Sequence, residues 1–186
     1  MDGTLTVPIH DFDQVREQLG IEGSEPILEA IDLMPENLAK ATRERLNEIE
    51  FELAELAIPQ PGCASVLQSL LDNGCKIGVL TRNGDAIAKR TLAAAGLASF
   101  FHDSDVIGRD SCLPKPCPKG ILSLLNRWDA QAADALMMGD YLFDLQAGKN
   151  ANVTTIHFDQ TGEFQWPELA DVKVSDWSQL SKMLSS

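Results

Sequence analysis

The spacing of apolar residues changes once along the chain, near residue 60. Between about residues 6 and 58 the apolar positions recur at helical intervals, which predicts helices throughout. Asp11 is placed to cap a first helix that Gly20 ends. A second helix is predicted from one apolar face, formed by Leu46, Ile49, Leu53 and Leu56. The run Pro59-Gln60-Pro61-Gly62 then breaks the helical pattern and marks a linker.

Beyond the linker, helices alternate with short apolar strands. We expect helices around residues 66–71, 85–95, 119–128 and 142–149, and strands at 76–80, 105–107, 135–138 and 153–158. Strands that alternate with helices of this length indicate right-handed crossovers. The pattern therefore predicts an α/β fold, with a parallel sheet covered by helices on both faces.

Composition and charge limit the classes of protein and of partner. The 186 residues are 44% apolar, which is typical of one compact globular unit. With 15 basic and 28 acidic residues the net charge is −13, so we expect no nucleic-acid partner bound by counterion release. No run approaches the roughly 18 apolar residues of a membrane helix, and the first residues lack the pattern of a secretory signal. We therefore expect a cytoplasmic protein without a membrane partner, whose four cysteines are free thiols.

The acidic residues are concentrated in the first third of the chain. Residues 1–60 hold 14 acidic and 4 basic residues, whereas residues 61–186 hold 14 and 11. An acidic stripe, which we interpret as a solvated surface, lies opposite the apolar face of the second helix and consists of Glu44, Glu48, Glu52 and Glu55. The two parts of the chain therefore differ in charge as well as in periodicity.

Polar side chains stand directly after the predicted strands and at the start of the chain. In a parallel sheet the carboxyl ends of the strands meet at one edge, where ligands bind. Carboxylates suit a hard cation such as Mg²⁺, whereas lysine and hydroxyl groups suit a phosphoryl group. Each residue alone has a plainer explanation, such as a helix cap, a surface turn or the end of a strand. In chain order the candidates are Asp2, Thr81, Arg82, Asn83, Lys115, Asp140 and Asp144.

The four segments that carry these residues resemble, in order and spacing, the motifs of the haloacid dehalogenase superfamily of aspartate-nucleophile phosphohydrolases. Residues 1–6 (MDGTLT) look like the tail of D-x-D-G-T-L-T, and residues 80–83 (LTRN) look like the second motif. Residues 115–118 (KPCP) match K-P-x-P, and residues 139–144 (GDYLFD) match G-D-x-x-x-D. The resemblance covers essentially the whole chain, and the short helical insert before Pro59 is similar to the cap of the phosphoglycolate phosphatase and β-phosphoglucomutase branch.

The resemblance implies a fold and a metal site. The fold would be a Rossmann-like core formed by residues 1–8 and 59–186, with a small α-helical cap at residues 9–58. Asp140 would bind Mg²⁺ directly and Asp144 directly or through water, with Asp2 as the third carboxylate of the site.

The resemblance also implies how a substrate would be held and cleaved. Thr81 and the backbone amides of Arg82 and Asn83 would hold the phosphoryl oxygens. Lys115 would neutralise the charge of the phosphate and the nucleophile, and Asp2 would be the general acid and base that protonates the leaving alcohol and then activates water. These roles agree with the demands of phosphoryl transfer, which are positioning and charge neutralisation.

The first aspartate of the D-x-D-G-T motif has no counterpart among the 186 residues. The nucleophile of D-x-D-G-T is the first Asp, and Asp2 is the second, so Met1 occupies the middle position. We expect Met1 to be an internal methionine preceded by roughly six to ten residues, an ordinary strand length. If the chain starts at Met1, its first central strand is truncated, and a narrowed sheet, a strand from another molecule or an unidentified segment fills the gap. For the 186 residues as written we expect little or no turnover.

These expectations combine into one function and two alternatives. The first is a Mg²⁺-dependent phosphatase that hydrolyses a small phosphorylated metabolite, phosphoglycolate-like or a sugar phosphate, through an aspartyl-phosphate. The alternatives are a sugar-phosphate mutase and a non-catalytic protein that binds phosphate and Mg²⁺ as a sensor or interaction module. The short cap favours hydrolysis of a compact substrate. We expect a monomer or a homodimer.

Overall fold

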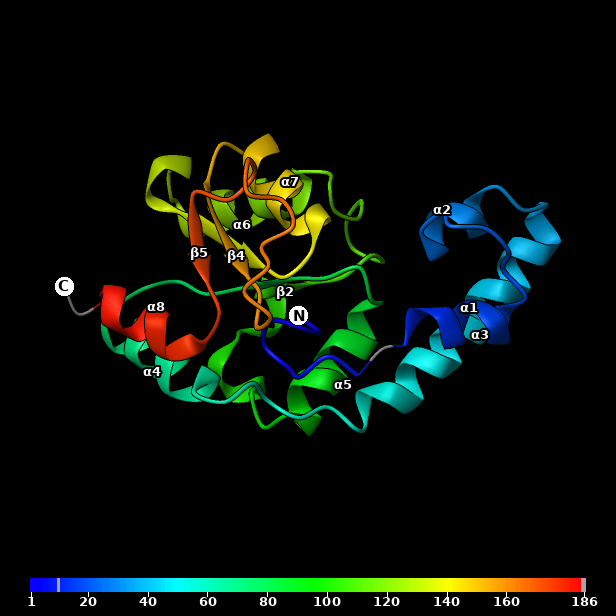
Figure 1. Ribbon diagram of the computed structural model, residues 1–186, viewed down its shortest axis with the longest axis horizontal. Helices are drawn as coiled ribbons and strands as arrows, with labels where there is room; N and C mark the ends of the chain where they lie inside the picture. Colours follow the sequence, from blue (N-terminus) through cyan, green and yellow to red (C-terminus); the bar gives the residue numbers. More distant parts are fainter. Residues whose placement is uncertain (10, 185–186) are drawn as a thin grey trace.

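The structure, a computed structural model, describes residues 1–9 and 11–184. It has two parts that lie side by side along the longest axis (Figure 1). One part consists of α1 (Phe12–Leu19), α2 (Ile27–Asp32) and α3 (Glu36–Ala54). We call residues 11–58 the cap and the remaining residues the core. The boundary predicted at residue 9 lies next to His10, which is outside the described residues.

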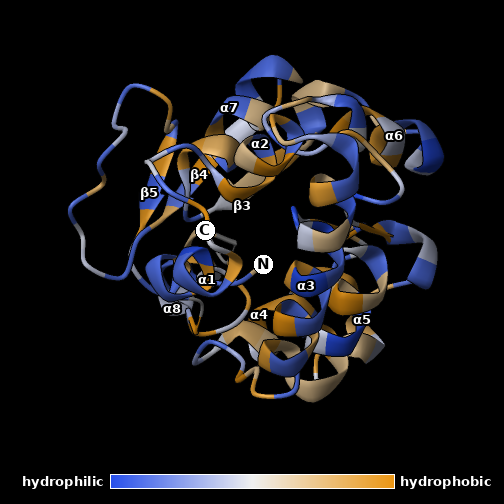
Figure 2. Cartoon of the chain, turned by 90° about the vertical axis from the view of Figure 1, so that its right-hand side faces the viewer, coloured by the Kyte–Doolittle hydropathy of each residue, from blue (hydrophilic) through white to orange (hydrophobic). Residues whose placement is uncertain are grey.

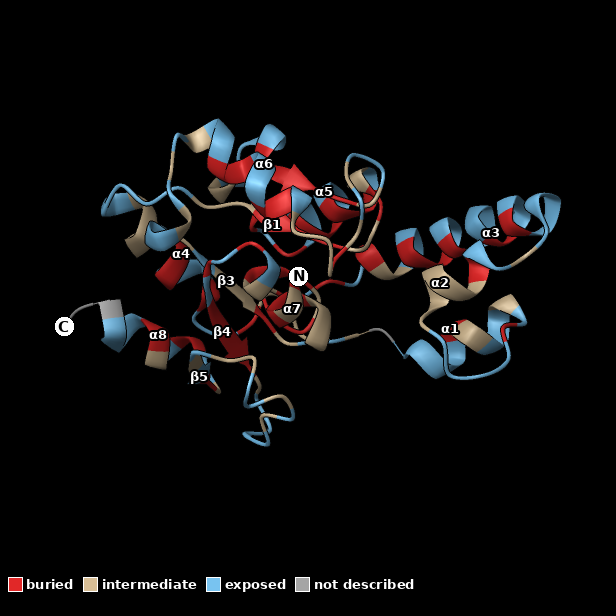
Figure 3. Cartoon of the chain, turned by 90° about the horizontal axis from the view of Figure 1, so that it is seen from above, coloured by how far each residue is buried: buried red, intermediate tan, exposed pale blue. Residues whose placement is uncertain are grey.

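The cap has a hydrophobic cluster of its own. Asp11 accepts a hydrogen bond from the Gln14 amide at 3.0 Å, and Gly20 ends α1 with a left-handed φ of 64°, so both predictions are confirmed. Buried and exposed turns alternate along α3 (Figure 3). The expectation that Leu56 continues the apolar face is wrong, because α3 ends before it and its side chain is 64% exposed. The buried cluster comprises Val15, Ile21, Ile31, Ala39, Leu46 and Ile49.

The core contains the alternating helices and strands that the sequence predicts. Its helices are α4 (Cys63–Asp72), α5 (Asp85–Ala94), α6 (Lys119–Trp128), α7 (Leu142–Asn150) and α8 (Trp177–Leu184). Its strands are β1 (Val79–Leu80), β2 (Val106–Ile107), β3 (Leu136–Gly139), β4 (Thr154–Phe158) and β5 (Val172–Val174). Several helices are banded in hydrophilic and hydrophobic colours in Figure 2, as amphipathic helices are.

The named strands all pair in parallel, but they form two sheets. β1 pairs with β2, with Val79 opposite Val106, while β4 lies between β3 and β5, with Gly139 opposite His157. The parallel α/β architecture is thus confirmed. The strand predicted at residues 76–80 is shorter, because only its last two residues pair with β2, and β5 was not predicted.

The first residues of the chain contact the cluster that joins the two sheets. Met1 is buried in the same hydrophobic cluster as Val79 of β1 and Ile156 of β4. The Met1 carbonyl accepts hydrogen bonds from the amides of residues 4, 5 and 6, so the segment folds as a tight turn rather than as a strand. The indole of Trp177 in α8 donates to the carbonyl of Thr4 at 3.1 Å. The N-terminal segment is thereby fixed in the middle of the core (Figure 1).

Two expectations from composition can be compared with the described residues. All four cysteines lie within them and are free thiols, with Cys63 buried and Cys75 exposed. No helix within residues 1–9 and 11–184 is long and apolar enough to cross a bilayer.

Candidate active site

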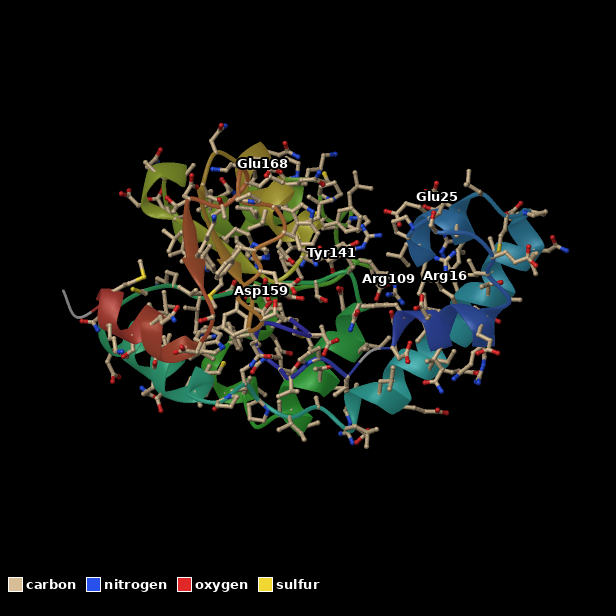
Figure 4. The ribbon with its side chains drawn as sticks, in the orientation of Figure 1. Arg16, Glu25, Arg109, Tyr141, Asp159 and Glu168 are labelled. Carbon is tan, nitrogen blue, oxygen red and sulfur yellow. The ribbon has the colours of Figure 1, made fainter. Side chains whose placement is uncertain are left out.

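The predicted polar residues come from loops at one edge of the core. Thr81 follows β1, Lys115 follows β2 and Asp140 follows β3. Because the strands are parallel, the loops after their carboxyl ends lie on the same side. Figure 4 shows two residues of these loops, Arg109 and Tyr141, on the side of the core nearest to the cap. The candidate site therefore faces the cap.

Lys115 and Asp144 form a buried ion pair in this site. Their side chains are 6% and 7% exposed, and the Lys115 ammonium also donates to the carbonyl of Leu80 at 2.9 Å. Asp144 accepts a further hydrogen bond from the Tyr141 amide at 3.1 Å. Burial alone would raise the pKa of Asp144, but Lys115 and the amino group of Met1 outweigh burial, and the pKa is lowered. Asp144 is thus held as a carboxylate, and Lys115 is fixed at the end of β1.

Asp140 contacts the N-terminal segment directly. Its carboxylate accepts a hydrogen bond from the Thr4 hydroxyl at 2.5 Å. Gly3 lies so close that a Cβ there would be 2.3 Å from Asp140 Oδ2, and its φ is +77°, so only glycine fits. Burial raises the pKa of Asp140, against the opposing effect of the Met1 amino group. The glycine of the first motif is therefore what lets the backbone reach Asp140.

The amino group of Met1 lies among these charges. Burial, and after it the charge of Lys115, lowers the pKa of this amino group, while Asp140, Asp144 and Asp2 act in the opposite direction. The backbone nitrogen of Met1 therefore lies beside the charged cluster, although Met1 is also part of the hydrophobic cluster.

Asp2 lies in the N-terminal turn and acts on the charge of the Met1 amino group. Its carboxylate accepts hydrogen bonds from the Thr6 hydroxyl and the Ile9 amide, both at 3.4 Å. Within the described part of the chain no group of three His, Cys, Asp or Glu side chains is close enough to hold a metal ion. The expected set of Asp2, Asp140 and Asp144 is therefore not assembled in this conformation.

Thr81, Arg82 and Asn83 form the turn after β1. Thr81 is buried, and its hydroxyl accepts a hydrogen bond from the Asn83 amide at 3.2 Å. Arg82 donates from Nη1 to the carbonyl of Lys115 at 2.5 Å, and its guanidinium carbon lies 4.5 Å from the centre of the Phe143 ring. The turn thus links the Thr81 hydroxyl to the loop that carries Lys115.

Among the residues that the structure describes, three arginine–glutamate pairs join the core to the cap, and the sequence did not predict them. The one available signal was the excess of acidic residues in the first 60 positions. The acidic stripe is not only a solvated surface, because one of its members, Glu55, binds an arginine of α5. The three pairs are Arg82–Glu29, Arg109–Glu50 and Arg90–Glu55.

Comparisons with known proteins place this geometry in context. The model of the haloacid dehalogenase-like hydrolase family matches residues 5–158. A Saccharomyces cerevisiae protein, named as an uncharacterized hydrolase, is 26% identical over 193 residues that cover 100% of this chain and 88% of the relative. A phosphoglycolate phosphatase of Psychrobacter arcticus is 28% identical over 165 residues, which cover 82% of this chain and 70% of the relative. A solved structure of a hydrolase from Pseudomonas syringae superposes with a TM-score of 0.80 at 21% identity, covering 99% of this chain and 94% of the other, which shows a shared fold.

Proposed function

We propose a function on the premise that the chain belongs to the haloacid dehalogenase-like hydrolase family, which the family match shows. The proposed reaction is the hydrolysis of a small phosphate monoester. The observation that carries it is the buried cluster of Lys115, Asp140 and Asp144, which surrounds the start of the first motif. The name of the Psychrobacter arcticus relative, a phosphoglycolate phosphatase, supports the same class of reaction.

In this proposal Lys115 and Thr81 hold the phosphoryl group. The transferring group carries its charge on its outer oxygens, which need positioning and neutralisation more than covalent chemistry. The Lys115 ammonium is buried and fixed by the Leu80 carbonyl, and the Thr81 hydroxyl lies one residue beyond Leu80. A fixed charge in a buried site interacts more strongly than one in water. These two side chains therefore suit the phosphate end of a substrate.

The proposed nucleophile is a carboxylate directly ahead of Met1. The Met1 amino group lies beside Lys115 and Asp140, so a residue attached there would reach the phosphoryl site. Its carboxylate would attack phosphorus while the leaving alcohol takes a proton from Asp2. Water that gives its proton to Asp2 would then attack the aspartyl-phosphate and release inorganic phosphate. For this task the Asp2 carboxylate would give up its hydrogen bonds from Thr6 and Ile9, which are both long, at 3.4 Å.

Asp140 and Asp144 are the residues that we propose to hold Mg²⁺. They fit this cation because carboxylate oxygens are the ligands that it prefers, and because Asp140 lies on the turn between β3 and α7 while Asp144 lies in the first turn of α7. Burial raises the pKa of Asp140, so added positive charge would stabilise its carboxylate form. A bound Mg²⁺ would supply charge that offsets the phosphoryl oxygens. A role for Asp2 at the metal requires its carboxylate to leave Thr6.

The test compares two extended forms of the chain. Both carry the same apolar segment ahead of Met1, which ends in Asp in one form and in Asn in the other. We expect the Asp form to release phosphate from small phosphate monoesters when Mg²⁺ is present, and the Asn form and the 186-residue chain to be roughly 10³-fold slower or worse. Mass spectrometry should find the aspartyl-phosphate only in the Asp form. Equal activity of the 186-residue chain and the Asp form would refute the proposal.

A second candidate is a phosphate-binding protein without turnover. The buried Lys115 ammonium and the buried Thr81 hydroxyl suit a phosphate whether or not a nucleophile stands beside them. Calorimetry with inorganic phosphate and Mg²⁺ separates the two candidates. Binding that is accompanied by no turnover in the Asp form would support the second candidate against the first.

A further inference from the structure

The guanidinium group of Arg82 is held by contacts within the core, and one of its nitrogens is bound by a residue of the cap. Its side chain is 19% exposed, its Nη1 donates to the Lys115 carbonyl at 2.5 Å, and its guanidinium lies over the Phe143 ring. Its Nη2 reaches both carboxylate oxygens of Glu29 in α2, at 2.7 and 2.6 Å. A single carboxylate thus occupies the edge of a guanidinium that the core already holds in place.

This edge lies next to the proposed phosphate site. Arg82 follows Thr81 in the chain, and it binds the backbone of Lys115, whose ammonium lies in that site. The guanidinium is therefore within the reach of a small molecule whose phosphate is held by Thr81 and Lys115.

The Arg82–Glu29 pair differs from the other two pairs between core and cap. Arg109 and Glu50 are 13% and 9% exposed, so this pair cannot open without stranding buried charges. Glu29 is 41% exposed, so it can turn into water at little cost. Glu55 is also 41% exposed, and its partner lies on α5 outside the phosphate site, which makes it a matched control.

We propose that Arg82 binds a carboxylate of the substrate, and that Glu29 occupies this place when no substrate is bound. The inference rests on the proposed function and deepens it, because it assigns the substrates to the phosphate monoesters of small hydroxy acids. A planar carboxylate reproduces both contacts that Glu29 makes and keeps the charge balance around Arg82. A substrate with an uncharged end would leave Arg82 bound to Glu29. The exchange is between two carboxylates, and no covalent bond changes.

The test measures ligand binding to the 186-residue chain by calorimetry with Mg²⁺ present, so it does not depend on turnover. The probes are 2-phosphoglycolate, which ends in a carboxylate, and 2-hydroxyethyl phosphate, which ends in a hydroxyl group. We expect 2-phosphoglycolate to bind roughly tenfold more tightly. Glu29→Gln should tighten the binding of 2-phosphoglycolate a further three- to tenfold, roughly, because the competing carboxylate is gone. The affinity for 2-hydroxyethyl phosphate should stay the same, and Glu55→Gln should change neither affinity.

Arg82→Gln provides the complementary variant, in which the preference for the carboxylate probe should disappear. Thermal unfolding of each variant shows whether it is folded. Equal binding of the two probes by the unmodified chain, or equal effects of Glu29→Gln on both, would overturn the inference while leaving the proposed function intact. If neither probe binds at all, the inference fails, and phosphate release by the Asp form then decides the proposed function separately.

Discussion

Replacing Glu50 by Ala tests how strongly the cap is joined to the core. The Glu50 carboxylate accepts hydrogen bonds from both terminal nitrogens of Arg109, at 3.0 and 2.7 Å. Both side chains are largely buried, at 9% and 13% exposure. The substitution therefore leaves the Arg109 guanidinium in a buried position without its counter-charge.

The structure sets the expected magnitude. Breaking a buried ion pair by removing one partner lowers the free energy of unfolding by about 3–5 kcal/mol. Arg109 would keep the Asn47 side chain and the Arg82 carbonyl as partners, at 2.7 and 2.8 Å. We therefore expect the low end of that range, about 3 kcal/mol. Glu55→Ala removes a solvent-exposed partner of Arg90 and should lower the free energy of unfolding far less, because water screens this pair.

Urea and thermal unfolding, followed by circular dichroism, measure the difference. For a chain of this length, 3 kcal/mol corresponds to a fall in Tm of about 6–12 °C. Adding Arg109→Met to Glu50→Ala should recover part of the loss, because the stranded charge is then removed as well. Equal destabilisation by Glu50→Ala and Glu55→Ala would refute the reasoning from burial.

Three further predictions concern single groups. Lys115→Met leaves a buried carboxylate uncompensated, so calorimetry should detect no phosphate binding and urea unfolding should show a loss of about 3–5 kcal/mol. The pKa of Asp171 is lowered from 3.8 to about 2, mainly by the hydrogen bond from Lys149 and next by the hydrogen bonds from Thr155 in β4. Its contribution to the free energy of unfolding is therefore complete above pH 4 and disappears as the pH falls towards 2. Asp171→Asn should flatten the pH dependence of unfolding in that window, and an unchanged slope would contradict this. Burial raises the pKa of the Cys63 thiol to about 12, so at pH 8 a thiol reagent should label the exposed Cys75 and leave Cys63 unreacted until the chain unfolds.

Local signals predicted the helices and their ends well. The bounds of α6, at Lys119–Trp128, are those expected from its apolar spacing, because four of its residues face the core at helical intervals. Asp11 and Gly20 act as caps because their effects depend on the nearest backbone groups alone. Strands were harder to predict, because β1 is limited to two residues by its partner and β5 is a three-residue strand with a lysine at its centre.

The motifs identified the residues of the candidate site, but not all of their contacts. The sequence predicts that Lys115 and Asp144 lie at the same edge of the sheet, but it did not predict the ion pair between them. The hydrogen bonds of the Asp2 carboxylate to Thr6 and Ile9 were not foreseen, because they depend on how the N-terminal segment turns. The contact of Arg82 with Glu29 joins residues on different parts of the molecule, so it depends on how the cap is placed over the core. Such contacts require the structure.

The enclosed position of Met1 has a practical consequence for handling the protein. A purification tag fused ahead of it would begin at a buried residue whose amino group lies beside Lys115 and Asp140. The last helix, α8, lies at the end of the molecule opposite the cap (Figure 1). Tags, dyes and surface tethers are therefore best attached after α8, where they leave the buried charges undisturbed.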